Sequence, residues 1–273
     1  APVLRVTTVG SYLGSEKLAV AADYEGFIEA MNQARASGAK HAVLECTSEA
    51  LAVGFAKAWP ISMGIFTNLT RDHLDGHGSP EHYLASKAQL FLHLPANGVA
   101  ILNAYDSATN LLAEIIPPGV RIVTYGLPSR SSGPALREVE WTANQVDVDW
   151  SGTQVDVQAP NRFGRVNRQM HLSAIGEIYV ENALAALAAA VEAGVSFAAA
   201  VQNLERTPAV PGRFEVFGSG PRGVVDYGHS PDAIERTLRT ARRLCPEKLI
   251  VVFGAGGGRD PIGRMPVWCT EEL

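Results

Sequence analysis

The segment 67–91 holds the densest group of side chains in this sequence that could do chemistry. A polar loop directly follows an apolar run at 61–66 and contains an Asp-His-Leu-Asp run at 72–75. Ser79 and Pro80 then have the types expected at a helix start, because a serine hydroxyl accepts an amide bond and a proline has no N–H to lose there. The sequence therefore predicts a buried strand, a polar loop with acids and histidines, and a helix.

Lys87 has an unusual position on this predicted helix. Tyr83, Lys87, Leu90 and Phe91 stand at i, i+4, i+7 and i+8, and so share one face. Burying a charged lysine beside apolar side chains is costly. Three outcomes are open: the side chain reaches out to solvent, it pairs with an acid, or it loses its charge chemically.

Further polar residues stand where predicted strands end. Glu45, Asn68 and Asn103 each follow or close an apolar run. Ligands in α/β sheets bind beyond the carboxyl ends of the strands, so these residues are candidates for a site, although polar strand ends are also common without one.

Composition restricts the class of protein. The chain has 273 residues, 47% of them apolar and 19% charged, with a net charge of -5. These values indicate an ordinary globular protein and argue against nucleic-acid binding, which needs a basic surface. Cys46, Cys245 and Cys269 are in no metal spacing and are expected to be reduced thiols. The most apolar stretch, 182–195, is too short to span a bilayer, so we expect a cytoplasmic protein with no membrane partner.

The elements that position these residues follow an alternating pattern. Short apolar runs alternate with helical patterns, which predicts an α/β fold with a mostly parallel sheet flanked by helices. The predicted strands are 41–46, 61–66, 98–103 and 121–125, and the predicted helices are 24–34, 80–91 and 108–115.

The second half of the chain changes character. Alternation within 137–158 predicts a β-hairpin turning at Ser151-Gly152. The proline and glycine break at 207–212 predicts a boundary between a domain at 1–209 and one at 210–273. The other predicted elements are helices at 180–193 and 197–204, strands at 214–217, 224–227 and 249–253, and a helix that begins at Ser230-Pro231.

The segments 67–91 and 44–51 resemble the central-domain signature of the Mur ligases, the ATP-dependent enzymes that add amino acids to the peptidoglycan precursor. The resemblance extends from about Val43 to Pro266 and is closest to the MurE-like type, which adds the third residue. It implies a P-loop-NTPase-like central domain with the β-hairpin region, followed by a partial Rossmann-like α/β domain.

The resemblance implies a magnesium site. In the family, the lysine that matches Lys87 is carbamylated and helps to hold Mg²⁺. The residues that match Glu45 and His73 are metal ligands. Hard oxygen ligands suit this ion. For Glu45 alone, a salt-bridged strand end is the structural alternative.

The resemblance also implies an ATP site. Asn182, in the run 180–187, matches the asparagine that contacts adenine, and Arg213, in the run 210–215, matches the hinge arginine that meets ATP. A plain helix start and a surface arginine are the alternatives. A match to the opening of the C-terminal domain places three more residues near the ribose and phosphates, with a plain strand-to-helix turn as the alternative: Asp226, Tyr227 and His229.

Some positions depart from the family. The sequence has no P-loop pattern, and Ala1 already lies past its expected place. Either this is part of a longer protein, with the nucleotide loop supplied by an N-terminal segment or a partner chain, or it is a reduced homologue. The family's Thr-Thr-Pro motif is absent at 19–23, Glu49 replaces a histidine, and Phe55 replaces an arginine that contacts the precursor.

We therefore expect an ATP-dependent ligase that joins an amino acid to a UDP-muramoyl-peptide-like carboxylate through an acyl phosphate, with ATP and Mg²⁺ as cofactors. Lys87, His73 and Arg213 are its expected catalytic residues. The alternatives are a Mur-fold ligase with a different acceptor and a non-catalytic Mur-like binding protein.

Overall fold

The computed structural model describes residues 1–69, 79–130, 133–163 and 166–252. Its chain forms two compact units, Ala1–Phe55 and Ala56–Leu273. Each is described by itself.

The first unit is a four-stranded sheet with a helix packed on it. The strand order is β3-β2-β1-β4, in which β1 is antiparallel to β2 and parallel to β4. Leu4 of β1 and Ala30 and Ala34 of α1 form its buried core. The elements are β1 (Val3–Thr7), β2 (Gly10–Leu13), β3 (Glu16–Lys17), α1 (Tyr24–Ala36), β4 (His41–Leu44) and α2 (Ser48–Ala52). The sequence did not predict β1, β2, β3 or α2.

The second unit is built on a parallel sheet, β5-β6-β7, formed by Met63–Phe66, Val99–Asn103 and Arg121–Tyr125. α5 (Pro80–Leu92) and α6 (Thr109–Ile115) pack on one face. α3 (Phe55–Ala58) precedes this sheet. The helix start at α5 is confirmed, since the Ser79 hydroxyl accepts a hydrogen bond from the His82 amide at 3.1 Å.

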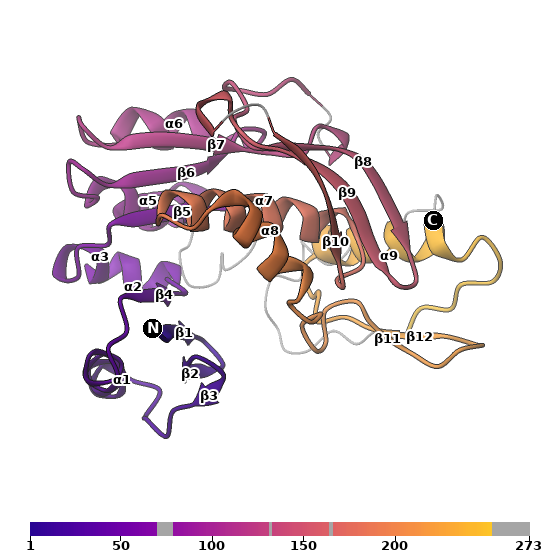
Figure 1. Cartoon of the computed structure of the whole chain (residues 1–273), viewed down its shortest axis with the longest axis horizontal. Coiled ribbons are helices and arrows are strands. Elements are labelled where there is room, and N and C mark those ends of the chain that lie inside the picture. Colours follow the sequence, from indigo (N-terminus) through magenta and orange to yellow (C-terminus); the bar gives the residue numbers. More distant parts are fainter. Residues whose placement is uncertain (70–78, 131–132, 164–165, 253–273) are drawn as a thin grey trace. The chain divides into compact units, whose positions relative to one another are not determined.

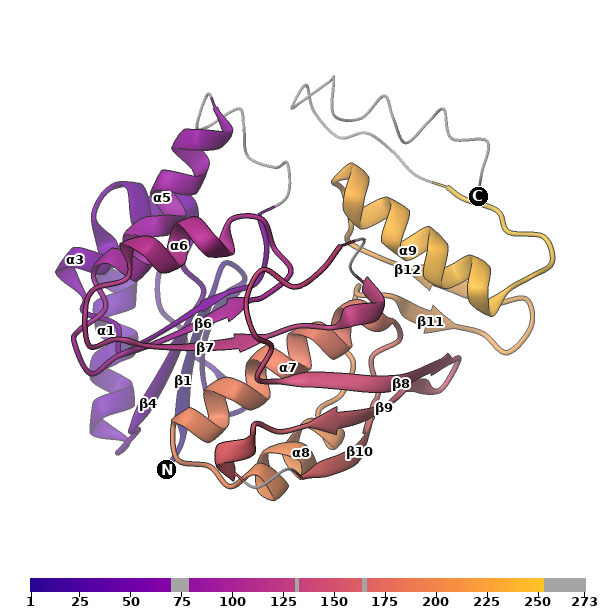
Figure 2. The same ribbon diagram turned by 90° about the horizontal axis from the view of Figure 1, so that it is seen from above.

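A long helix covers the other face of this sheet. α7 (Glu177–Glu192) packs against the parallel strands on one side and against a second, antiparallel sheet on the other (Figures 1 and 2). That sheet has the order β10-β9-β8. Its strands are β8 (Thr142–Asp149), β9 (Gly152–Gln158) and β10 (Asn167–Leu172), and α8 (Phe197–Glu205) packs beside α7. The predicted hairpin is thus confirmed, while β10 was not predicted.

The last described part is a hairpin followed by a helix. β11 (Glu215–Phe217) pairs antiparallel with β12 (Gly223–Val225), and α9 (Pro231–Leu244) follows, capped by Ser230. The strand predicted at 249–253 is wrong over its described part, because 249–252 have no ladder to a neighbouring strand. An extended apolar run becomes a strand only where a neighbour supplies those hydrogen bonds.

Close packing explains one glycine in the parallel sheet. A Cβ on Gly64 of β5 would lie 3.1 Å from the Phe91 ring of α5. The helix therefore approaches the strand at a distance that a larger residue would increase. This contact sets the position of α5, and with it that of Lys87.

Candidate functional site

The carboxyl edge of the parallel sheet holds the chain that leads into the 70–78 loop. The Asn103 Nδ2 donates to the Thr67 carbonyl at 2.9 Å, and the Tyr125 hydroxyl donates to the Phe66 carbonyl at 3.0 Å. The Leu69 amide donates to the Asp106 Oδ2 at 2.8 Å. Three side chains from β6, β7 and the turn after β6 therefore hold residues 66–69.

Burial strengthens this arrangement. Asn103 and Tyr125 are both buried. Burial raises the pKa of Tyr125, and the nearby carboxylates of Glu181 and Asp106 raise it further. The Tyr125 phenol therefore stays protonated and remains a hydrogen-bond donor to the strand end.

Lys87 lies on the same helix face as Tyr83, as the sequence predicted. Its Nζ is 4.9 Å from the centroid of the Tyr83 ring, a cation–π distance. The Lys87 side chain is half-buried. Its proposed partner His73 lies outside the described residues, so their relation is not tested.

Glu45 follows β4 in the first unit. Its Oε2 accepts hydrogen bonds from the Thr8 amide at 2.9 Å and the Thr8 hydroxyl at 3.2 Å. The turn after β1 thus fixes the direction of the carboxylate. Among the described residues, the other carboxylate oxygen, Oε1, accepts no hydrogen bond.

The start of α7 is fastened to the antiparallel sheet by Thr153. The hydroxyl of this fully buried residue accepts from the Gly176 amide at 2.9 Å and donates to the Ala174 carbonyl at 2.8 Å. The helix therefore begins at Glu177, three residues before the predicted start at 180. Asn182 is exposed on this helix, so its amide is available to a ligand.

Two carboxylates hold the hinge, residues 210–214. The Glu215 Oε2 accepts from the Gly212 amide at 2.6 Å. The Asp226 carboxylate accepts from the Phe214 amide at 2.8 Å and from the Gly228 amide at 2.7 Å. Phe214 has a φ of 48°, which is strained for a phenylalanine, and its ring is buried against Ile175 and Ala241. Burial and the Asp226 bond thus offset the strain at Phe214.

Three of the predicted nucleotide residues form a stack on this hinge. The Arg213 guanidinium lies 4.8 Å from the Tyr227 ring centroid, and the Tyr227 and His229 rings are 5.3 Å apart, edge to face. All three side chains are exposed. A guanidinium on an open aromatic ring is well suited to meet a phosphate or a base.

Tyr179 connects the hinge with α7. Burial raises the pKa of the Tyr179 hydroxyl to about 12, with a further increase from the Asp226 carboxylate, while Arg213 lowers it. The first turn of α7 and the hinge therefore influence each other electrostatically.

The structure thus brings Arg213, Asp226, Tyr227 and His229 together. Glu45 lies in the first unit, Lys87 lies in the second, and His73 lies outside the described residues, so this set stays a prediction. Sequence reasoning missed the roles of Asp106, Tyr125, Thr153 and Tyr179. The polar run Asn103-x-x-Asp106 directly after a buried strand was the one local signal for this group.

Cys46 is half-buried near the candidate metal residue of the first unit. Burial raises the pKa of its thiol, and the Glu45 carboxylate raises it further. Cys46 and Cys245 are both free thiols, and Cys269 lies outside the described residues.

Two observations on the described residues bear on cofactors and surroundings. No group of three or more His, Cys, Asp and Glu side chains there could hold a metal ion. Within the same ranges, no helix is both long and apolar enough to cross a bilayer.

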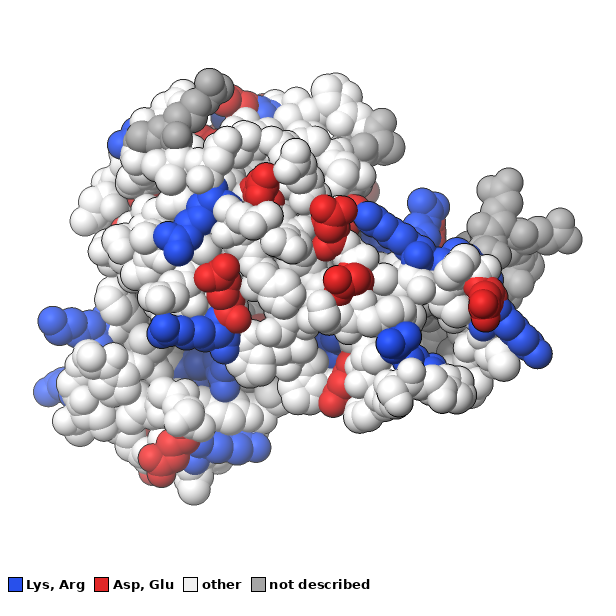
Figure 3. Space-filling model, turned by 45° about the vertical axis from the view of Figure 1, so that its right-hand side comes forward, with Lys and Arg blue, Asp and Glu red and all other residues white. Residues whose placement is uncertain are grey.

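On the face seen in Figure 3, basic and acidic side chains are interspersed rather than gathered by sign.

Comparison with known families gives two matches along the chain. The model of the Mur ligase middle domain matches residues 3–190, and that of the Mur ligase glutamate ligase domain matches residues 212–267.

Two curated relatives carry the same name, UDP-N-acetylmuramoyl-L-alanyl-D-glutamate–2,6-diaminopimelate ligase. The one from Ralstonia nicotianae is 38% identical over 235 residues, 84% of this chain and 45% of that protein. The one from Thermosynechococcus vestitus is 36% identical over 228 residues, 82% of this chain and 43% of that protein. This chain thus spans about half the length of the relatives it matches.

Solved structures of Mur ligases have a similar fold. The structure of a 2,6-diaminopimelate ligase has a TM-score of 0.74 and 28% identity, covering 97% of this chain and 53% of that one. The MurF ligase of Thermotoga maritima in complex with ADP has a TM-score of 0.59, covering 74% of this chain and 44% of that one, and at 19% identity it shows the fold alone. Because the middle-domain match covers well over half of its residues, the chain belongs to the Mur ligase family.

Proposed function

We propose that this chain provides the middle domain and the beginning of the C-terminal domain of an ATP-dependent amide ligase. The observation that carries this proposal is the match to both Mur ligase domains, in order, at 3–190 and 212–267. The relatives' names supply the substrate class: an amino acid and a UDP-muramoyl-peptide carboxylate. The proposed domain boundary stays at 209/210, and the proposed location is the cytoplasm, where ATP is available.

The proposed reaction has two steps. The acceptor carboxylate attacks the γ-phosphorus of ATP, the bond to ADP breaks, and an acyl phosphate forms. The amino group of the incoming amino acid then attacks the acyl carbon, phosphate leaves, and the amine gives up a proton. When bound, Mg²⁺ would offset the negative charge of the phosphates.

Glu45, His73 and a carbamylated Lys87 are the proposed metal ligands. The Glu45 carboxylate supports this because Thr8 fixes one of its oxygens and leaves the other without a hydrogen bond among the described residues. Carboxylate and carbamate oxygens are the donors that Mg²⁺ prefers. The half-buried position of Lys87 supports a modification that replaces its positive charge.

Asn182, Arg213, Asp226, Tyr227 and His229 are the proposed nucleotide residues. An amide can donate to and accept from adenine at once, which suits the exposed Asn182. The Arg213 guanidinium lies over the Tyr227 ring and its side chain is exposed, which supports a role in binding phosphate oxygens. The ADP complex of a MurF ligase with the same fold supports a nucleotide here.

A ligase with a different acceptor is the second candidate, and Phe55 favours it. The Phe55 ring packs edge to face on Phe27, with centroids 5.5 Å apart. It therefore packs on a helix residue of the first unit and offers no charge to an anionic precursor. Glu49 is exposed and acidic, which is also unfavourable for an anionic peptide.

We call the protein that contains this chain together with the rest of the proposed ligase the ligase-competent protein. The test is a ligation assay on that protein. It is incubated with ATP, Mg²⁺, 2,6-diaminopimelate and either UDP-muramoyl-dipeptide or a carboxylate acceptor without the nucleotide. ADP release together with the mass of the ligated product identifies the acceptor. Lys87→Met should abolish both signals, and Lys57→Met, at an exposed lysine, is the matched control.

The outcomes separate the candidates. Product from the nucleotide-linked acceptor supports the 2,6-diaminopimelate ligase, and product from the other acceptor supports the second candidate. ATP binding with no product from any acceptor overturns the ligase and favours the non-catalytic binding protein.

A further inference from the structure

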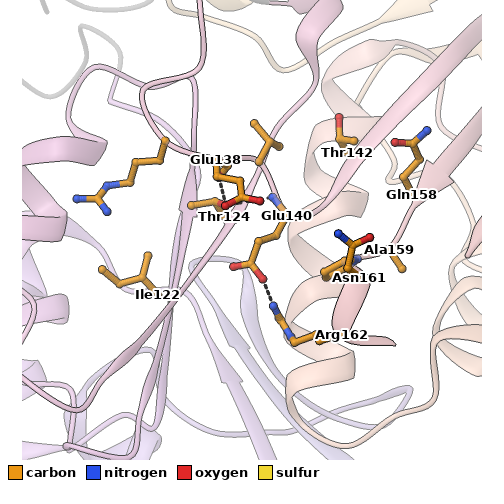
Figure 4. Close-up of a pocket in the computed structure, with 12 residues that line it drawn as sticks. Ile122, Thr124, Glu138, Glu140, Thr142, Gln158, Ala159, Asn161 and Arg162 are labelled. Carbon is orange, nitrogen blue, oxygen red and sulfur yellow. Dashed lines mark hydrogen bonds and ion pairs between the residues drawn. The ribbon is translucent and has the colours of Figure 1, made fainter. Parts of the chain in front are cut away.

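A polar recess lies in the second unit, and none of the residues proposed above for the metal or the nucleotide lines it. Its volume is about 480 Å³, within the range of small-molecule pockets. Three segments line it: β7, the stretch that leads into β8, and the stretch that follows β9 (Figure 4). The side chains used below are Arg137, Glu138, Glu140, Gln158, Asn161 and Arg162.

One wall of the recess is fixed by ion pairs. Arg162 pairs with Glu140, and its Nη2 lies 2.6 Å from the Glu192 Oε1. The Glu192 side chain is only 4% exposed and also pairs with Arg121. Such a network is preorganised, and its opposite charges largely neutralise each other within the wall.

The floor is fixed as well. The Thr124 hydroxyl of β7 donates to the Glu138 carbonyl and accepts from the Glu140 amide at 3.1 Å. In Figure 4, Glu138 and Glu140 extend between the β7 residues on one side and Arg162 on the other. The recess therefore has a defined shape without any ligand.

Several polar side chains that line this recess have no hydrogen-bond or ion-pair partner among the described residues. Among the described residues, the side chains of Arg137, Glu138, Gln158 and Asn161 make no hydrogen bond or ion pair. The Thr142 Oγ1 is buried and has no partner there. A buried hydroxyl without a partner is costly, so this atom favours a polar occupant.

We propose that the recess binds a small zwitterion of the free amino-acid class. Because Arg162 and Glu140 neutralise each other, one cation and one anion remain unpaired, Arg137 and Glu138. A ligand that complements both carries one carboxylate and one ammonium group. A simple anion would leave the Glu138 carboxylate unpaired, and a simple cation would leave the Arg137 guanidinium unpaired. The amides of Gln158 and Asn161 can serve either ligand group.

This inference is independent of the proposed ligase function, because the recess contains none of its residues. It predicts a second amino-acid site on the chain. Occupancy of such a site would change with the concentration of free amino acids.

The experiment uses a series of zwitterions with increasing separation of their charges: glycine, 4-aminobutyrate, 6-aminohexanoate and L-lysine. Butyrate and butylamine are the matched single-charge probes. Binding is followed on the chain by the indole N–H resonance of Trp141, which lies between Glu140 and Thr142. One zwitterion should bind at least about fivefold more tightly than either single-charge probe, since each exposed ion pair is modest.

Variants locate the site. Arg137→Gln and Glu138→Gln should each weaken that zwitterion about two- to fivefold, because each removes one ion pair. Arg168→Gln, at an exposed arginine of β10, is the matched control and should have no effect. Both recess variants remove side chains that have no partner among the described residues, so folding should be unchanged.

Three results would overturn the proposal: equal binding of butyrate and the zwitterions, no binding of any probe, or identical affinity in Arg137→Gln, Glu138→Gln and Arg168→Gln. Loss of ligation activity with zwitterion binding retained would instead count against the proposed function alone.

Discussion

The carboxyl edge of the parallel sheet and the hinge both hold a short backbone segment, but they do so with different numbers of side chains. At the sheet edge, Asn103, Asp106 and Tyr125 each hold a different residue of 66–69. At the hinge, the two oxygens of Asp226 hold both Phe214 and Gly228. The Glu215 carboxylate also accepts from the Gly212 amide, at 2.6 Å. The sheet edge is therefore held by three side chains and the hinge by two carboxylates.

This difference suggests what each region does. A segment held by three buried or half-buried groups keeps one geometry, as a metal-binding loop requires. The hinge is held by fewer side chains, so we expect its geometry to change more readily when Asp226 or Glu215 is replaced. The exposed group of Arg213, Tyr227 and His229, which we propose meets ATP, lies at this less firmly held segment.

The largest expected effect is on turnover, if both regions serve one reaction. Lys87→Met at the sheet side and Arg213→Gln at the hinge should each lower kcat of the ligase-competent protein by at least about 100-fold, the usual loss when one charge-stabilising group is removed. Steady-state ADP release measures this. Loss of activity in only one variant would mean that the two regions do not share a reaction.

A second expectation concerns stability at the hinge. Asp226→Ala leaves the Phe214 and Gly228 amides without their acceptor, and should lower the free energy of unfolding by about 2–3 kcal/mol. Asp226→Asn keeps one acceptor oxygen and should lose about half as much. Urea unfolding followed by tryptophan fluorescence measures both. If Asp226→Ala lowered the free energy of unfolding by less than about 0.5 kcal/mol, Asp226 would not stabilise the hinge.

A third expectation tests whether the side chains at the sheet edge hold residues 66–69 jointly. Tyr125→Phe and Asp106→Ala should each cost about 1–2 kcal/mol in the free energy of unfolding, since each removes a hydrogen bond to the same segment. Their double variant should differ from the sum by more than about 0.5 kcal/mol. The pair Asp106→Ala and Asp226→Ala shares no partner and should be additive. Additivity in both pairs would show that residues 66–69 are not held jointly.

Local signals predicted the elements best. The α5 prediction at 80–91 agrees with Pro80–Leu92, because Ser79 and Pro80 determine the helix start by themselves. The start of α7 was predicted three residues late because the Gly176 amide bonds to the distant Thr153. The strand β10 escaped prediction because only Met170 and Leu172 among its six residues are buried, too sparse a pattern to detect.

The residues of the candidate site were also predicted from local motifs and missed where they depend on long-range contacts. Family resemblance located Arg213 and Tyr227, and the structure places their side chains together. The bond from Tyr125 to the Phe66 carbonyl joins residues far apart in sequence. No periodicity or motif reports such a pairing, since it arises only when β5 and β7 enter one sheet. Long-range polar contacts therefore had to come from the structure.

The smallest expected effect links the two regions through Tyr179. Its pKa in the folded chain is about 12, above the ordinary value of 10.0, because of burial and then the Asp226 carboxylate. The folded state thus holds the phenolic proton more tightly, and this contribution is complete below pH 10 and is lost as pH rises toward 12.

Tyr179→Phe removes the proton and should flatten the pH dependence of the free energy of unfolding across this window. The difference should be about 1 kcal/mol near pH 11.5, reduced from the full linkage value because the half-buried hydroxyl is partly screened by solvent. Urea unfolding of both proteins at pH 9, 10 and 11.5 measures the difference. Parallel curves would show that the folded state does not raise the pKa of Tyr179. The effect of Tyr179→Phe should be smaller in an Asp226→Asn background than in the wild-type chain. That result would show that the hinge carboxylate influences the helix that carries Asn182.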